Sequence, residues 1–243
     1  MIAHNDYLYS FGGFTGESPK NLTSFGTIDR FDLRPESNAW TTLELKLSKP
    51  RSQHSVVQFE DRVYILGGWD SAVLGSGSPT AHEDAFHRNI EVFDLKTETF
   101  LDSDLELPST GRRAFASLVW NNKIILAGGF GEKRGAFLKS VIQLDPATKT
   151  WSELPALPKK LIFPMIVSFW GNLYLVGGSG RESIETSYVL TPTSKEWMPT
   201  SIQTGDLVER TITQINDKEW LLFGGRFADD SLSPKIDIIK STR

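Results

Sequence analysis

Pairs of adjacent glycines recur along this chain of 243 residues, and each pair ends a short apolar run. The pairs are Gly12-Gly13, Gly67-Gly68, Gly128-Gly129, Gly177-Gly178 and Gly224-Gly225. Successive pairs are separated by 55, 61, 49 and 47 residues. Self-similarity at a period of about 50 residues is the signature of a repeat array, in which each repeat is one supersecondary unit that packs against its neighbours. The chain is therefore predicted to fold as five copies of one unit.

The third unit shows the strand pattern most completely. An apolar run, Ala114–Trp120, is followed by two asparagines and a second apolar run, Lys123–Ala127, which is the pattern of a tight β-hairpin. A third strand is predicted at Ser140–Leu144, and a fourth begins at Trp151. Each unit is therefore predicted to form a small antiparallel sheet of four strands.

Four stretches share the motif parts of these units: PRSQHSVVQFEDRVYILGG, IEVFDLKTETF, VIQLDPATKTW and YVLTPTSKEW. In these stretches the chain resembles the kelch repeat family. The resemblance implies an all-β, kelch-like β-propeller with about five four-stranded blades, of which the last is incomplete. We expect a single domain over residues 1–243, with unit boundaries near 1–48, 49–108, 109–157, 158–202 and 203–243.

Two features depart from the kelch pattern. Thr191 stands in the fourth unit where aspartate is usual before the last turn. The fifth unit has three predicted strands, Thr211–Ile215, Glu219–Phe223 and Lys235–Ile239, and no fourth strand led by an aromatic residue. Because kelch-like propellers usually have six or seven blades, the chain could be a fragment, a small closed ring or part of an assembly.

The residue types within each unit have physical reasons. Val63–Leu66 and Leu173–Val176 are almost continuously apolar, as expected of strands that neighbouring sheets cover on both faces. The paired glycines permit positive φ angles and a close approach of neighbouring backbone. The aromatic residue that opens each fourth strand is large enough to fill the space between blades. These aromatic residues are Trp40, Phe100, Trp151 and Trp197.

In a four-stranded antiparallel blade, the connections from strand 2 to strand 3 and from strand 4 to the next blade lie on one face, here called the long-loop face. Long loops on a rigid scaffold usually carry binding residues. The window just before each first strand is also rich in lysine and arginine. Basic residues around the mouth of a propeller channel suit an anionic ligand, because the arginine fork matches a carboxylate. A more ordinary role for these residues is to keep loop tips solvated.

We therefore predict a protein-interaction module that binds a partner, through an acidic segment for example, at the long-loop face. The aromatic residues that follow the glycine pairs are typical interface anchors, unless they pack beneath their own loops. The predicted binding residues are Arg51, Trp69, Arg112, Arg113, Phe130, Lys160, Arg181, Arg210 and Arg226. The alternative is a sugar-active propeller resembling the sialic-acid mutarotases, in which a polar pocket holds a carboxylated sugar. No catalytic residue is assigned, and a non-enzyme is favoured.

The composition excludes several classes of protein. The chain has no cysteine, so disulfides, thiolate catalysis and cysteine-bound zinc are excluded. A net charge of −4 argues against a nucleic-acid or anionic-membrane partner, because such binding depends on dense positive charge. The sequence contains no run of about 18 apolar residues, so no membrane span is predicted. We expect a cytoplasmic protein without a cofactor, and its oligomeric state is left open.

His82 and His87 are weak candidates for metal ligands, since they lie with two carboxylates in the sequence AHEDAFHRN. Their spacing is not the i, i+4 pair of a zinc-binding helix, so no metal site is predicted. His54 recurs in no other unit, and we interpret it as a structural residue on the inner strand of a blade.

Overall fold

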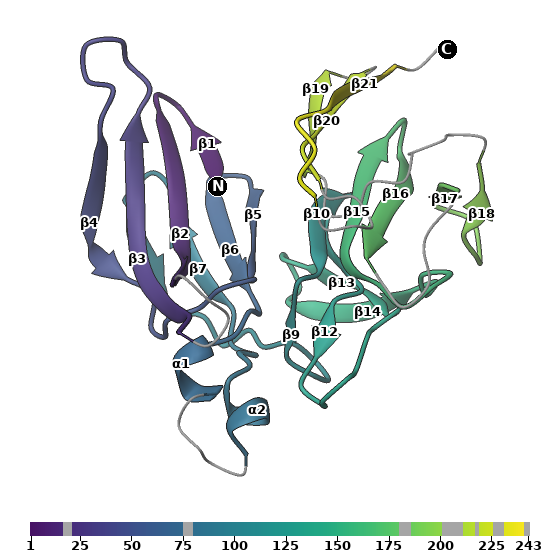
Figure 1. Ribbon diagram of the computed structural model, residues 1–243, viewed down its shortest axis with the longest axis horizontal. Helices are drawn as coiled ribbons and strands as arrows, with labels where there is room; N and C mark the ends of the chain where they lie inside the picture. Colours follow the sequence, from purple (N-terminus) through teal and green to yellow (C-terminus); the bar gives the residue numbers. More distant parts are fainter. Residues whose placement is uncertain are drawn as a thin grey trace. The chain divides into compact units, whose positions relative to one another are not determined.

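The computed structural model describes residues 1–16, 21–74, 80–179, 186–200, 211–216, 219–225 and 231–240 (Figure 1). The chain divides into two compact units, which are described separately. Unit 1 comprises Met1–Ala114 and Gly131–Ala136, and unit 2 comprises Phe115–Phe130 and Phe137–Arg243.

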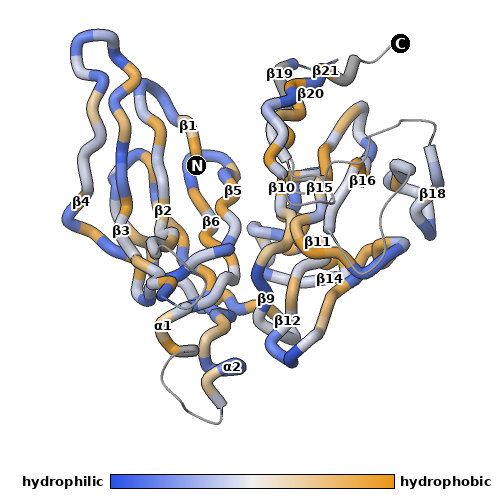
Figure 2. The backbone as a smooth tube through the Cα atoms, viewed as in Figure 1, coloured by the Kyte–Doolittle hydropathy of each residue, from blue (hydrophilic) through white to orange (hydrophobic). Residues whose placement is uncertain are grey.

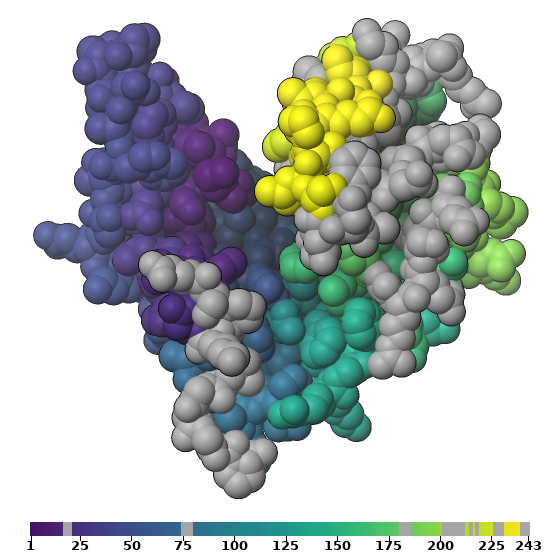
Figure 3. Space-filling model, viewed as in Figure 1, coloured from purple at the N-terminus to yellow at the C-terminus, as the bar shows by residue number. Residues whose placement is uncertain are grey.

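Unit 1 contains two antiparallel sheets whose strands are ordered as they follow in the chain. Sheet 1 consists of β1 (Ile2–His4), β2 (Tyr7–Thr15), β3 (Thr23–Asp32) and β4 (Trp40–Lys46). Sheet 2 consists of β5 (Ser55–Phe59), β6 (Arg62–Leu66), β7 (Glu91–Asp94) and β8 (Thr99–Leu101). Two helices that the sequence did not predict, α1 (Ser71–Leu74) and α2 (Ala81–Asp84), lie in the insertion between β6 and β7. The edge strand β4 is part of the molecular surface (Figure 3).

Unit 2 contains three further antiparallel sheets. Sheet 3 consists of β10 (Ala116–Trp120), β11 (Lys123–Ala127), β13 (Val141–Asp145) and β14 (Thr150–Leu154). Sheet 4 consists of β15 (Ile162–Phe169), β16 (Asn172–Ser179), β17 (Tyr188–Leu190) and β18 (Met198–Pro199). Sheet 5 consists of β19 (Thr211–Asn216), β20 (Glu219–Phe223) and β21 (Ile236–Lys240). Two-residue strands, β9 (Arg112–Arg113) and β12 (Phe130–Gly131), lie outside these sheets.

The predicted fold class is confirmed. The chain is all-β, and it forms five successive antiparallel sheets of the kind that make the blades of a β-propeller. Four of the sheets have four strands, and the last has three within the part of the chain that the structure describes. The expectation that the five units form a single domain stays a prediction.

Each glycine pair lies where the second strand of a sheet ends or turns. In sheet 1, φ is 57° at Gly12 and 133° at Gly13, values that favour glycine over any residue with a Cβ atom. A Cβ atom on Gly12 would also lie 2.7 Å from the backbone oxygen of Arg51. The backbone turn and the close approach of the next segment of chain therefore both require glycine at this position.

A side chain caps the turn between the third and fourth strands. Asp94 and Asp145 each accept hydrogen bonds from the backbone N–H groups two and three residues later. Thr191 takes this place in sheet 4, and its hydroxyl lies 2.6 Å from the hydroxyl of Ser194. The Ser194 backbone N–H also donates to the carbonyl oxygen of Thr191 (3.1 Å). The departure from the kelch pattern is therefore accommodated within the turn itself.

The core of each unit is formed by apolar side chains of successive sheets. In unit 1, Tyr9 and Phe11 of sheet 1 pack against Phe93 of sheet 2, and the Phe11 and Phe93 ring centroids are 5.4 Å apart. Figure 2 colours the backbone by hydropathy and labels β11. In unit 2, β11 contributes Ile125 to a cluster that includes Leu175 of sheet 4. Fully burying one such side chain contributes about 1.5 to 3 kcal/mol, so these contacts join neighbouring sheets.

The aromatic residues that open the fourth strands are not equivalent. Trp197 is 7% exposed and donates its indole N–H to the carbonyl oxygen of Pro155 (2.9 Å), so it links sheet 4 to the end of sheet 3 as predicted. Two others are half-buried: Phe100 and Trp151. Trp40 is 52% exposed, contrary to the prediction, because it pairs with Phe31 on the face of sheet 1 that points away from sheet 2.

Candidate functional site

One backbone contact recurs where three successive sheets begin. The second glycine of a pair donates its backbone N–H to a backbone carbonyl oxygen that lies 32 to 44 residues later in the chain. These contacts are Gly13 to Arg51 (2.9 Å), Gly68 to Arg112 (2.8 Å) and Gly129 to Leu161 (2.7 Å). Two residues after each acceptor, φ is positive, at Gln53, Ala114 and Phe163. The three acceptors are therefore equivalent, and we call their place in the repeat the inner position.

The side chain at the inner position is buried in all three repeats. The relative exposure is 0% for Arg51, 1% for Arg112 and 0% for Leu161. Neither arginine is therefore a solvated loop tip. Because Leu161 fills the same place without any charge, the fold itself does not require a cation there. The positive charge of Arg51 and Arg112 therefore has a reason other than the packing of the repeat.

Arg51 is held by an acid and by the backbone. Its Nη2 atom lies 2.6 Å from Glu91 Oε1, and its Nη1 atom donates to the carbonyl oxygen of Gly67 (3.2 Å). The other oxygen of Glu91 accepts the backbone N–H of Ser48 (2.8 Å). Burial lowers the pKa of Arg51, and the Glu91 carboxylate opposes this effect. Glu91 was not predicted from the sequence. The strand position that it occupies in sheet 2 is held by the apolar Ile142 in sheet 3, and this difference could have pointed to Glu91.

Arg112 lies in a different electrostatic environment. Burial lowers its pKa to about 10, and desolvation is the dominant cause. Strand register places Ile142 in sheet 3 where sheet 2 has Glu91. The two arginines therefore share a backbone position but not an acid at the matching strand position. With a pKa of about 10, Arg112 keeps its positive charge at neutral pH.

Arg113 and Trp69 form a stack in unit 1. The guanidinium carbon of Arg113 lies 3.9 Å from the centroid of the Trp69 ring, which is a cation–π contact. The Nη1 atom of Arg113 donates to Oε1 of Gln53. Both stacked side chains are half-buried, and the indole also contacts the ring of Phe86 (6.2 Å between centroids). Two residues that the sequence predicted for binding are thus brought together, and Gln53 is a third that it missed.

The insertion that carries α2 packs against the loop Gly131–Ala136 within unit 1. The His82 ring nitrogen Nδ1 lies 2.5 Å from the backbone oxygen of Glu132. The carboxylate of Glu132 accepts the backbone N–H of Gly111. A Cβ atom on Gly111 would lie 2.8 Å from Cβ of Phe86, so glycine is needed for this close packing. These contacts fix the position of Phe86, against which the Trp69 ring packs.

The two histidines that the sequence named as weak metal candidates make separate backbone contacts. His87 is buried, its Nε2 atom lies 2.9 Å from the carbonyl oxygen of Pro50, and burial lowers its pKa to about 4. His82 contacts the backbone of a different loop. Among the described residues, no group of three or more metal-ligating side chains is arranged to hold an ion.

His54 lies against the glycine pairs of both sheets in unit 1. Its Cε1 atom is 3.2 Å from the place where Gly12 would carry a Cβ atom. Phe115 and Pro164 occupy the same place three residues after Arg112 and Leu161. Burial lowers the pKa of His54 to about 4, so it is neutral at physiological pH. This environment supports the structural interpretation of His54.

The remaining predicted binding residues lie elsewhere. In unit 2, Lys160 is exposed, and Phe130 packs edge-on against Phe137 (5.4 Å between centroids). Three predicted residues lie outside the part of the chain that the structure describes: Arg181, Arg210 and Arg226. The site that the structure assembles therefore belongs to unit 1.

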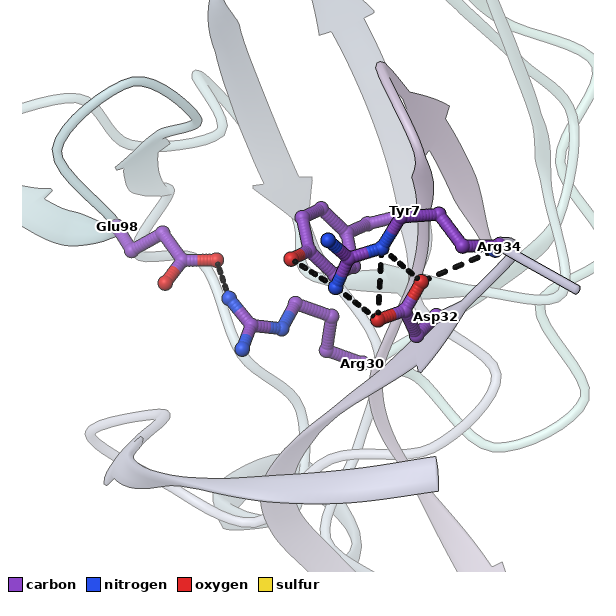
Figure 4. Close-up of polar contacts among 5 residues, drawn as sticks. All are labelled: Tyr7, Arg30, Asp32, Arg34 and Glu98. Atoms are coloured by element: carbon purple, nitrogen blue, oxygen red, sulfur yellow. Dashed lines mark hydrogen bonds and ion pairs between the residues drawn. The ribbon is translucent and has the colours of Figure 1, made fainter. Parts of the chain in front are cut away.

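A second polar cluster, drawn in Figure 4, joins side chains of sheet 1 to Glu98, which directly precedes β8 of sheet 2. Nη1 of Arg30 lies 2.6 Å from Glu98 Oε1, and its guanidinium carbon lies 4.4 Å from the Tyr7 ring centroid. Arg34 pairs with Asp32 and lowers the pKa of that carboxyl group. Because its charges are matched internally, this cluster joins the two sheets and makes a poor binding site.

Successive antiparallel sheets, glycine pairs that meet the next repeat, and capped turns before aromatic-led strands define a kelch-type β-propeller. The KLHDC2/KLHL20/DRC7 Kelch-repeats domain family matches residues 1–164. The chain therefore belongs to the kelch-repeat family.

Individual relatives are distant. Alpha-scruin of Limulus polyphemus is 21% identical over 238 residues, which cover 95% of this chain and 25% of the relative. Kelch-like protein terF of Aspergillus terreus is 26% identical over 231 residues, which cover 91% of this chain and 46% of the relative. The chain thus spans less than half the length of these curated relatives.

A solved structure described as "Structure of YjhT" aligns with 98% of this chain and 80% of its own, with a TM-score of 0.80 and 18% identity. This likeness supports the fold alone. Of the helices that the structure describes, none is long and apolar enough to cross a membrane, since α1 and α2 have four residues each.

Proposed function

We propose that this protein is a recognition module that binds an acidic segment of a protein partner at the long-loop face of unit 1. The observation that carries the proposal is the stack of Arg113 on the half-exposed ring of Trp69. Kelch-repeat propellers generally serve as protein-interaction modules, which supports the same reading.

The chemistry of the stack suits an acidic ligand. Arginine and tryptophan are the residue types that most often dominate binding energy at interfaces. The guanidinium of Arg113 is held in place by the indole beneath it and by Gln53, so little side-chain entropy remains to be lost on binding. Arg112 adds a buried positive charge next to it in the chain, which raises the local potential for a carboxylate.

The sugar-active alternative finds less support. Acid–base catalysis needs a side chain within reach of the substrate whose proton can move. Two nearby candidates are engaged elsewhere, since His87 contacts the backbone oxygen of Pro50 and Glu91 is bonded to Arg51. We therefore propose a non-enzyme. The cytoplasmic location expected from the sequence stays a prediction. A contribution to binding from the other predicted residues also stays a prediction: Phe130, Lys160, Arg181, Arg210 and Arg226.

Fluorescence polarisation with a labelled octaglutamate peptide tests the proposal. The wild-type protein should bind this peptide and not a labelled octalysine, and added salt should weaken the binding. A charge-assisted hydrogen bond contributes about 1.5 to 3 kcal/mol, so Arg113→Ala should weaken binding roughly 10- to 100-fold.

The matched control is Arg62→Ala, since Arg62 is an exposed arginine at the opposite end of sheet 2. It should change the affinity less than twofold. The proposal fails if Arg62→Ala weakens binding as much as Arg113→Ala, or if neither change matters. Faster anomer exchange of N-acetylneuraminate in the presence of the protein, measured by NMR, would favour the sugar-active alternative instead.

A further inference from the structure

The turns between the first and second strands differ in one residue. Each turn begins with a residue of positive φ, which is 50° at Asn5, 54° at Glu60, 49° at Asn121 and 46° at Trp170. Asparagine is favoured in this left-handed conformation, whereas a bulky aromatic residue is an outlier there. Since three sister turns form with polar residues, the fold does not require tryptophan at residue 170.

The indole of Trp170 is presented to solvent. It is 47% exposed, and its ring lies on the ring of Phe169, with centroids 4.2 Å apart and an angle of 31° between the planes. Phe169 is itself buried against Trp220, at 4.3 Å between ring centroids. One face of the indole is therefore supported by the core of unit 2, and the half-exposed side chain is an apolar platform in contact with solvent.

Asparagines lie at the turn that carries this platform and in the neighbouring turn of sheet 3. Trp120 donates its indole N–H to the carbonyl oxygen of Gly171 (2.8 Å), which brings the turn of sheet 3 next to the turn of sheet 4. The turn residues of sheet 3, Asn121 and Asn122, are both exposed. Asn172 directly follows the Trp170-Gly171 turn and is half-exposed. Two adjacent turns thus carry one exposed indole and three asparagines.

We propose that this end of unit 2 is a carbohydrate-binding site that takes a neutral sugar. A pyranose ring has an apolar C–H face that can stack on the indole of Trp170, and hydroxyl groups at its edge. An asparagine amide both donates and accepts hydrogen bonds, which suits paired hydroxyl groups. An amphipathic aromatic platform with a few polar groups is the usual composition of a small-molecule site.

An acidic peptide and a protein surface fit this platform less well than a neutral sugar does. An acidic peptide would need cations, yet the nearby Lys123 already lies 4.0 Å from the carboxylate of Asp145. A protein interface needs a contiguous apolar core, whereas this platform is one indole whose turn is followed in the chain by the polar Asn172. The carbohydrate site also lies at the turn end of its sheets rather than at their long-loop face, so it is independent of the peptide-binding proposal.

Isothermal titration with a panel of neutral hexasaccharides tests the site, using maltohexaose, cellohexaose, mannohexaose and chitohexaose. At least one should bind, and the intrinsic tryptophan fluorescence should change on binding. Trp170→Asn, which installs the residue of the sister turn at Asn121, should weaken this binding at least tenfold. The same variant should keep or raise the thermal midpoint of unfolding, because it removes an aromatic residue from a left-handed turn.

The matched control is Trp40→Ala, which removes another exposed tryptophan, in sheet 1 of unit 1. It should leave the affinity unchanged within twofold. Three results would each overturn the proposal: no hexasaccharide binds, Trp170→Asn binds like the wild type, or Trp40→Ala weakens binding equally.

Discussion

Removal of the Glu91 carboxylate should strongly destabilise unit 1, because it would leave the guanidinium of Arg51 buried without its acid. The side chains of Arg51 and Glu91 are 0% and 12% exposed. Breaking such a buried pair costs about 3 to 5 kcal/mol. The bond from the backbone N–H of Ser48, which would be lost as well, contributes about 1 kcal/mol.

Glu91→Ala should therefore lower the free energy of unfolding by about 4 to 6 kcal/mol. For a chain of this size, that loss corresponds to a fall in thermal midpoint of roughly 10 to 20 °C. Guanidinium and thermal unfolding, followed by circular dichroism, measure both quantities. A more exposed ion pair gives the control, since Asp61 lies 2.5 Å from Lys96 and their side chains are 42% and 68% exposed. Asp61→Ala should cost less than about 1 kcal/mol.

The double variant Arg51→Leu with Glu91→Ile separates lost pairing from lost packing. It installs the leucine that stands at the inner position of sheet 4, Leu161, and the isoleucine that stands at the Glu91 position of sheet 3, Ile142. Replacing a buried ion pair by apolar residues of similar size is often neutral or stabilising, so the double variant should recover the stability that Glu91→Ala loses. If Glu91→Ala costs no more than Asp61→Ala, or if the double variant remains as unstable as the single one, the reasoning is refuted.

Three further predictions concern stability. Burial holds the pKa of His87 near 4, below its usual 6.5, so the unfolded state binds more protons between these values. Stability should fall by up to about 3 kcal/mol as the pH drops through this range, and His87→Gln should reduce that loss in acid titrations. Gly12→Ala should cost more than about 2 kcal/mol in urea unfolding, whereas Gly135→Ala, with φ of 77° and no atom within 4 Å, should cost about 1 kcal/mol. Trp197→Ala should cost about 3 to 5 kcal/mol and the exposed Trp40→Ala less than 1 kcal/mol, and equal losses in thermal melts would contradict this.

The repeat architecture was predictable because glycine pairs and apolar runs are local signals. The glycine pairs mark the strand ends because both positive φ and close backbone approach exclude other residues there, as at Gly12. The turn aspartates were also predictable from local sequence, because Asp94 caps its turn by accepting hydrogen bonds from residues only two and three positions later. The helices α1 and α2 were not predicted, because segments of four residues leave no periodic pattern to detect.

The site was only partly predictable. The positive charge of Arg51 and Arg112 was visible in the sequence, but the burial of their side chains was not. Burial follows from the contact of each arginine's backbone with the glycine pair of the preceding repeat, and this contact joins residues far apart in the chain. The stack of Arg113 on Trp69 joins residues from two different repeats. Pairings of this kind depend on how repeats pack, and no local pattern along one chain specifies them.

The bond between a glycine pair and the inner position is made entirely by main-chain atoms. The identity of the side chain at that position can therefore change without altering the bond, as the sequence Arg, Arg, Leu in three repeats illustrates. In evolutionary terms, the side chain at this position can change together with the neighbours that pair with it, while the joint between repeats stays constant. The core beside each joint can thus differ from repeat to repeat, with an Arg51–Glu91 pair in sheet 2 and a leucine in sheet 4, while the main-chain bond between the repeats is kept.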